Sequence, residues 1–262
     1  SHERIGSALQ IRDAELAVMR KVDLVLSYNE IEHAVILSHN LDSTRIAKCP
    51  WVVSTRSEVP GFEARSGIAF LGAYQHHPNV EAAEYFLREV MPLLRERLPG
   101  VELRLYGSDM PESWRDLFAG EEDVALPGWV ASVDEVYDNS RVFVAPLRSG
   151  AGIKGKVIGA MAHGIPCVLS PVAAEGTGIR DGLEALVATT PAQWVDAVEL
   201  LYNNSEAWSK QQHAAWAYTQ TEFSLARGCE LMQAALEMVD IFAAPDSSCL
   251  SHDTLSQVTK QT

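Results

Sequence analysis

RVFVAPLRSGAGIKGKVIGAMAH, residues 141–163, is the stretch that decides the fold. It opens with an apolar run at 141–146 that predicts a buried strand. RSGAGIKGK at 148–156 predicts a glycine-rich loop, and the apolar residues at 155–163 predict a helix. A strand, a glycine loop and a helix in this order are typical of α/β proteins, in which ligands lie at the carboxyl ends of the strands.

The loop carries positive charge as well as glycine. Arg148, Lys154 and Lys156 place three cations close together in an otherwise acidic chain. Small residues let the backbone approach a ligand closely, and free N–H groups at a helix start attract anions. The loop therefore predicts a phosphate or diphosphate site, the alternative being a solvated basic loop that matches by chance.

Two nucleotide signatures fit this loop only in part. The glycines of 150–155 satisfy G-x-G-x-x-G, and Glu175 supplies the acid expected further on. That dinucleotide fingerprint usually follows the first strand of its unit, where GAYQHHPN stands at 72–79. The loop also reads as G-x-x-x-x-G-K, but Val157 stands where a P-loop needs Ser or Thr for magnesium. Diphosphate binding without a metal is the chemistry that remains.

Strands and helices alternate on both sides of the loop. Helical patterns lie at 3–21, 29–38 and 78–97, and the pattern is all helix from 191 to about 242. Strand-like runs lie at 22–27, 46–53, 68–72, 101–107, 124–127, 141–146, 165–170 and 185–189. The expected fold is α/β, a Rossmann-like, doubly wound parallel sheet with a helical C-terminal section.

Composition narrows the function. The 262 residues carry a formal net charge of −14, so nucleic acid, which needs a basic footprint, is not an expected partner. The four cysteines are scattered, and Cys167 and Cys229 are expected to be buried, so no disulfide framework or zinc site is predicted. We expect no signal peptide, and no apolar run reaches the roughly 18 residues of a membrane span. We expect a cytoplasmic protein without an integral membrane segment, and peripheral contact with a lipid-linked substrate stays open.

Several segments in the same order resemble a known family, the retaining family 4 glycosyltransferases of the GT-B fold, in their C-terminal, donor-binding domain. Residues 145–178 resemble the pattern P-x-R-x-G-x-G-x-[KR]-x-K-x-x-E-A-M-A-x-G-x-P-V-V, followed by an acid-glycine pair. GAYQHHPN resembles the first turn of one subgroup, G-x(5)-P-N, and LPGWV resembles the family's G-[WF]-V turn. The likeness runs from about Ile68 to Phe223.

The resemblance implies a hexosyltransferase that moves a sugar from a nucleotide-sugar donor to an acceptor hydroxyl. The donor is a substrate, so no cofactor and no metal is expected. Lys154, Lys156 and Arg148 would stabilise the departing diphosphate, and Glu175 would bind sugar hydroxyls unless it is only a solvated loop acid. The expected donor-binding residues are Gly72, His76, Trp129, Val130, Gly150, Ala151, Gly152, Lys154 and Glu175.

Two departures from the family pattern bear on this site. The family usually has Glu at the position of Gly159, where it binds the ribose hydroxyls, and glycine offers no such group. Many relatives carry Arg and Lys in the first turn, where this chain has Gln75, His76 and His77. Either His is a candidate phosphate donor, the alternative being a solvated loop residue.

The resemblance also divides the chain. Residues 1–53 resemble the end of a GT-B N-terminal domain, 54–67 a linker, and 68–223 the nucleotide-sugar-binding domain. A crossing helix is expected at 224–243 and a disordered tail at 244–262. Because the N-terminal domain supplies the acceptor site, we expect a fragment with little turnover, whose carbohydrate or glycoconjugate acceptor binds through the missing part.

Two other classes of function stay open on the sequence. An NAD-dependent oxidoreductase would use the G-x-G-x-x-G match, and a non-catalytic nucleotide-binding or assembly module would explain Gly159. Trp194, Trp208 and Trp216 are expected to pack in the core, because tryptophans at helical spacing are buried more often than they stack on sugars.

Overall fold

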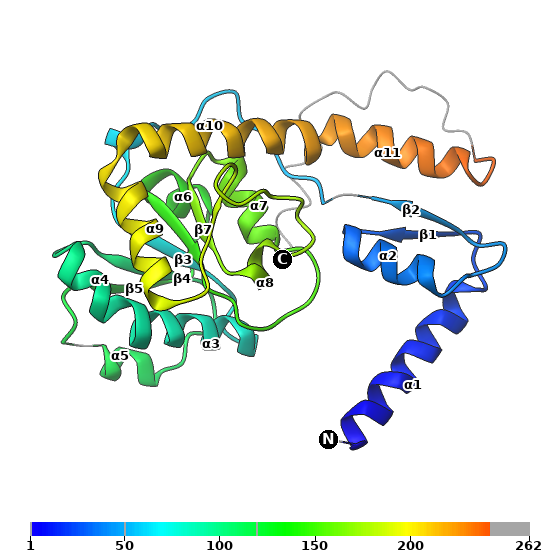
Figure 1. Ribbon diagram of the computed structural model, residues 1–262, viewed down its shortest axis with the longest axis horizontal. Helices are drawn as coiled ribbons and strands as arrows, with labels where there is room; N and C mark the ends of the chain where they lie inside the picture. Colours follow the sequence, from blue (N-terminus) through cyan, green and yellow to red (C-terminus); the bar gives the residue numbers. More distant parts are fainter. Residues whose placement is uncertain (1, 50, 119, 242–262) are drawn as a thin grey trace.

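The computed structural model describes residues 2–49, 51–118 and 120–241, so the tail expected to be disordered, 244–262, lies outside the described residues. Two parallel sheets form, one of two strands near the N-terminus and one of six strands (Figure 1). The predicted α/β class with a parallel, doubly wound sheet is confirmed.

The larger sheet has the strand order β5-β4-β3-β6-β7-β8, and every pairing is parallel. Numbered along the chain, these strands read 3-2-1-4-5-6, which is the order of doubly wound dinucleotide folds. They are β3 (Ile68–Leu71), β4 (Leu103–Tyr106), β5 (Val124–Gly128), β6 (Val142–Ala145), β7 (Cys167–Leu169) and β8 (Leu186–Val187). All four residues of β6 are buried, because helices cover both faces of the sheet.

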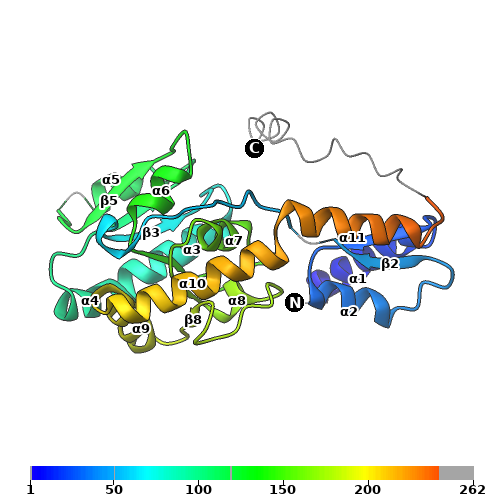
Figure 2. The same cartoon turned by 90° about the horizontal axis from the view of Figure 1, so that it is seen from above.

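Helices form a layer on each face of this sheet (Figures 1 and 2). One layer holds α3 (His77–Tyr85), α4 (Met91–Arg97) and α9 (Pro191–Asn203), and α9 packs on α4. The other holds α6 (Asp134–Asn139), α7 (Gly155–Ala162) and α10 (Ser205–Glu222), and α10 packs on α7. Two short helices, α5 (Ser113–Leu117) and α8 (Pro171–Ala174), follow β4 and β7.

The core lies between the sheet and the two layers. Phe70 and Phe143 come from central strands, and Trp194 and Trp208 come from the C-terminal helices; all four are at most 1% exposed. Trp208 also donates its indole N–H to the carbonyl of Arg141 at 2.7 Å, which satisfies its polar atom. The two tryptophans are therefore core residues, as predicted, whereas Trp216 is only partly buried.

The N-terminal part, residues 2–53, has its own small sheet. It contains α1 (His2–Met19), β1 (Leu24–Ser27), α2 (Glu30–Ser38) and β2 (Arg45–Lys48). The last helix, α11 (Leu225–Glu237), leaves the six-stranded part and lies along this small sheet (Figures 1 and 2). A Cβ placed on Gly228 would lie 2.5 Å from Cγ2 of Val52, so α11 packs on the segment that follows β2.

The structure corrects the expectation of one helix at 78–97. A π-helical turn, Phe86–Val90, separates α3 from α4, and Pro92 stands at the start of α4. Proline has no N–H to donate and its ring crowds the carbonyl four residues back, so the helix widens just before it. Cys229 is exposed rather than buried, because α11 buries only the face of Gly228 and Ala235 and Cys229 points away from it.

Candidate functional site

The glycine loop leaves the sheet at its topological switch point. β3 and β6 lie side by side in the centre of the sheet, and the chain leaves them towards opposite layers, into α3 and α7. A crevice at the carboxyl ends of such a strand pair is the usual ligand site of open α/β sheets. The two loops meet there, because a Cβ placed on Gly150 would lie 4.0 Å from the Cβ of Pro78.

Backbone shape explains two of the loop glycines. Gly150 has φ 117° and Gly152 has φ 76°, values that L side chains rarely adopt. These turns carry the chain from β6 to the first residue of α7, Gly155, with Lys154 as the residue before the helix. The free N–H groups of that helix start therefore lie beside the loop, as an anion site requires.

Lys154 is buried against the loop. Its side chain is only 9% exposed, and Nζ donates to the carbonyl of Gly152 at 2.5 Å. Burial lowers the pKa of Lys154 below its usual value, while the negative charges of Glu175 and Glu32 oppose the shift. A poorly hydrated ammonium at a glycine loop is well placed to bind an anion.

Lys156 lies beneath the first turn, the loop between β3 and α3. Its Nζ donates to Oδ1 of Asn79 at 2.5 Å and lies 4.9 Å from the centre of the Phe70 ring. Burial and the neighbouring charge of Lys154 lower the pKa of Lys156 to about 8. Asn79 in turn donates to the carbonyl of Ala73 at 2.8 Å. A single side chain therefore links the second lysine to the first turn.

The first turn brings some of its predicted residues to the site and leaves others in solvent. Gly72 is buried where β3 ends, and its N–H donates to the carbonyl of Tyr106 at 3.0 Å. His76 and His77 are exposed at the start of α3, and neither side chain caps the helix. Both imidazoles are thus free to meet a ligand at the crevice, and neither is fixed in place by the protein.

Arg148 turns away from the two lysines. Its guanidinium lies over the Tyr85 ring, 5.3 Å from the centroid. It lines a cavity of about 330 Å³ together with Ser170, Thr189 and Trp194, on the side of the sheet that α9 covers. The sequence grouped Arg148 with Lys154 and Lys156, and the structure places its guanidinium against Tyr85.

The remaining predicted residues spread along the same edge of the sheet. Trp129 and Val130 follow β5 at the outer end, and Trp129 is 71% exposed. Ala151 and Glu175 are exposed, in the loops that follow β6 and β7. The edge thus presents an aromatic side chain, the glycine loop with its lysines, and a carboxylate, in the spatial order of the strands.

Gly159 faces a neighbouring side chain rather than open space. A Cβ there would lie 3.4 Å from the hydroxyl oxygen of Tyr137, whose O–H donates to the carbonyl of Lys156 at 3.0 Å. The ring of Tyr137 is buried against His163, which bonds to Asp134 at 2.8 Å. A side chain at position 159 would therefore begin in van der Waals contact with Tyr137.

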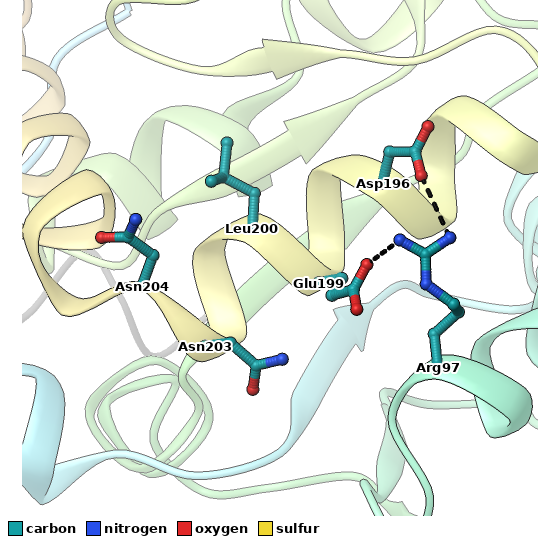
Figure 3. A pocket seen from close by; sticks show the side chains of 6 residues that line it. All are labelled: Arg97, Asp196, Glu199, Leu200, Asn203 and Asn204. Carbon is teal, nitrogen blue, oxygen red and sulfur yellow. Dashed lines mark hydrogen bonds and ion pairs between the residues drawn. The ribbon is translucent and has the colours of Figure 1, made fainter.

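A depression of about 370 Å³ lies elsewhere on the molecule. Figure 3 shows Arg97, at the end of α4, pointing towards Asp196 and Glu199 on α9. This end of α4 leads into β4, so the depression lies at the amino ends of the strands, away from the glycine loop. Its one cation is already paired with two carboxylates, so it does not compete with the glycine loop as an anion site.

Asn79 and Glu32 are site residues that the sequence did not single out. Asn79 stood in the quoted P-N pair, which was the available signal. Glu32 lies far away in the chain and carried no signal. Among residues 2–49, 51–118 and 120–241, no group of three His, Cys, Asp or Glu side chains could hold a metal ion. Over the same residues, no helix is long and apolar enough to span a membrane.

A sequence profile of the family called glycosyl transferases group 1 matches residues 65–204, more than half of the chain. The chain belongs to this family. Its match therefore covers the site from the first turn through the glycine loop to Glu175, and leaves out only Glu32 of the site residues named above. Membership favours the glycosyltransferase interpretation of the loop over the oxidoreductase that the bare G-x-G-x-x-G also suggested.

A curated relative and several solved structures resemble this group 1 glycosyl transferase chain. It is 24% identical over 128 residues to an uncharacterized 44.6 kDa protein in the cps region of Klebsiella pneumoniae, covering 46% of this chain and 33% of that protein. S. aureus TarM superimposes with a TM-score of 0.70 at 14% identity, covering 87% of this chain and 45% of its own.

Two further structures show the same likeness. The pneumococcal O-GlcNAc transferase GtfA, in complex with UDP and GlcNAc, has a TM-score of 0.66 at 16% identity over 87% of this chain and 47% of its own. Sucrose-phosphate synthase of Thermosynechococcus elongatus has 0.67 at 15% identity over 86% and 61%. At these identities the likeness is of the GT-B fold alone, and the chain spans less than two thirds of each protein.

Proposed function

We propose that this chain binds the donor of a glycosyltransferase, a nucleoside diphosphate sugar whose hexosyl group is transferred to an acceptor hydroxyl. The observation that carries the proposal is the placement of Lys154 and Lys156 around a glycine loop at the switch point of the sheet. Family membership and the UDP bound in structures of TarM and GtfA support the same donor class.

The chemistry follows from where the positive charge lies. As the bond to the anomeric carbon breaks through an oxocarbenium-like state, negative charge grows on the departing diphosphate. The two ammonium groups and the N–H groups at the start of α7 would stabilise that charge more than the ground state, which lowers the barrier. We therefore expect the diphosphate to be held without a metal, as in a retaining enzyme of the family 4 type.

The other site residues receive matching roles. Trp129 and Val130 would border the nucleobase, Gly72 and His76 the phosphates, and Glu175 the hydroxyls of the transferred sugar. The acceptor, a carbohydrate or glycoconjugate hydroxyl, would approach from the side that faces the N-terminal part. Cys49, Cys167 and Cys229 have free thiols, which suits the reducing cytoplasm expected from the sequence.

A thermal-shift screen tests the proposal. UDP, GDP and ADP are added to wild type, Lys154→Ala and Lys210→Ala, each with and without EDTA; Lys210 is exposed on α10, away from the loop. A nucleotide at 100 times its Kd stabilises the folded state by about 2.7 kcal/mol, or about 5–10 °C for a chain of this size.

Wild type and Lys210→Ala should respond alike to at least one nucleotide, with or without EDTA, and Lys154→Ala should lose the response. An equal response in Lys154→Ala would remove that lysine from the site. No response from any protein would leave the non-catalytic module as the better account of the chain.

A further inference from the structure

Three side chains of the N-terminal part lie against three glycines, which belong to the loops after β6 and β7 and to the start of α7. A Cβ added to Gly155 would lie 3.2 Å from the ring of Trp51, and one added to Gly176 would lie 2.8 Å from the Cβ of Asn29. A Cβ on Gly152 would lie 3.7 Å from Oε1 of Glu32. The side of the glycine loop nearest α2 therefore meets protein as well as solvent.

The placement of Glu32 is fixed by the start of its helix. Asn29 is the residue before α2, and its Oδ1 accepts the N–H of Glu32 at 2.8 Å. The same Asn29 side chain packs on Gly176, so the first turn of α2 is held against the loop after β7. Glu32, on that turn, is thereby carried to Gly152.

As a result, carboxylates from two different parts of the chain lie near Lys154. Glu175 belongs to the loop after β7, and Glu32 belongs to the N-terminal part. Lys154 itself is buried and bonded to the carbonyl of Gly152, the glycine that Glu32 approaches. Burial lowers the pKa of Lys154, and the charges of both carboxylates raise it, because they lie close enough to stabilise the ammonium.

We propose that Glu32 is a built-in counterion of Lys154 which the donor diphosphate displaces, so that the N-terminal part competes with the donor for the glycine loop. The inference rests on the proposed function. When a diphosphate binds the ammonium of Lys154, the Glu32 carboxylate lies beside the negative charges of the diphosphate. The half-buried Glu32 side chain is repelled and turns away. Glu32 thus weakens donor binding and ties it to the position of α2.

The test compares Glu32→Gln with Glu30→Gln by isothermal titration of UDP and of inorganic pyrophosphate into the full chain. Glu30 lies on the same helix, so its variant changes the charge equally, but it pairs with Lys48 on the surface. Glu32→Gln should bind both probes about three- to tenfold more tightly than wild type at low salt, a gain that shrinks at high salt. Glu30→Gln should match wild type.

Each other outcome is decisive. Equal or weaker binding by Glu32→Gln would overturn the counterion role, and weaker binding would make Glu32 a donor contact instead. Binding of neither probe by any of the three proteins would overturn the proposed function together with this inference. Equal binding by wild type and Glu32→Gln would overturn this inference alone.

A measurement without donor checks the electrostatic effect of Glu32 on Lys154. The rate at which an acylating reagent modifies Lys154 is followed by peptide mass spectrometry in the same three proteins. Removing the Glu32 charge lets burial lower the pKa of Lys154 further, so more of the amine is neutral and acylation is faster. Glu32→Gln should react faster than wild type and Glu30→Gln, and equal rates in all three would refute this effect.

Discussion

Lys156→Met should stabilise the folded chain at pH 7 while removing a proposed diphosphate contact. The substitution keeps an unbranched apolar stem and removes the ammonium. In wild type, among the described residues, that ammonium has one hydrogen-bond partner, the Oδ1 of Asn79 at 2.5 Å, and it faces the Phe70 ring. A buried charge so sparsely compensated costs stability that a methionine does not.

The magnitude follows from the pKa. Lowering the pKa of Lys156 from 10.5 to about 8 corresponds to about 3 kcal/mol of destabilisation at pH 7. The residue is partly exposed, which reduces the figure to about 2 kcal/mol. Methionine leaves Asn79 without its donor, at a cost of about 1 kcal/mol. The net expectation is a variant about 1 kcal/mol more stable than wild type at pH 7.

The sign with pH is fixed by linkage. Between pH 8 and 10.5 the folded lysine has lost its proton while the unfolded lysine keeps it, so wild type gains stability as pH rises. The advantage of Lys156→Met should therefore be full below pH 8, cross zero between pH 8 and 10.5, and become a deficit of about 1 kcal/mol by about pH 10.5, where only the lost partner of Asn79 remains. Urea denaturation of both proteins at pH 7, 9 and 10.5 measures this difference. A variant less stable at pH 7, or a difference independent of pH, would refute the reasoning.

Three other predictions concern stability. Arg65 is 1% exposed and donates to four backbone carbonyls, three of them in distant segments, so Arg65→Met should lower the free energy of unfolding by about 3–5 kcal/mol in urea, and a loss below about 1 kcal/mol would contradict its role. Gly176→Ala should cost about 1–2 kcal/mol more than Gly182→Ala, since both have φ above 70° but only Gly176 has a neighbour within 4 Å; equal losses would deny the contact with α2. The Arg95 guanidinium keeps the pKa of Asp123 below its usual value, so Asp123→Asn should cost about 1 kcal/mol at pH 7, and this cost should disappear as the pH falls through the lowered pKa, as acid titration of the unfolding midpoint will show.

Local pattern was enough to predict the frame of the fold. The apolar run at 141–146 and the glycine at 155 predicted β6 and α7 almost to the residue. Burial on both faces of a strand and the start of a helix can both be recognised from neighbouring residues. The short helices α5 and α8 were missed because four or five residues give too little periodicity. The break before Pro92 was missed because a π turn depends on how the helix packs.

The site residues also divide into those that the local sequence predicts and those that only the folded structure brings together. Gly150, Gly152 and Lys154 are adjacent in sequence, so their chemistry could be read from one segment. Arg148 was grouped with them by proximity in the chain, yet its side chain lies over Tyr85. The contacts of Asn79 and Glu32 join segments far apart in the chain, and only the packing of the sheet and α2 brings them to the loop.

Over the described residues the chain crosses twice between its two parts, and both crossings meet at one point. The N–H of Val53 donates to the carbonyl of Phe223 at 2.9 Å, where the outgoing segment passes the junction of α10 and α11. With both links pinned together, sliding of one part past the other is opposed, and the remaining soft motion is a swing about this junction. Rotation about this junction would move α2 away from the glycine loop while the packing within each part stays intact.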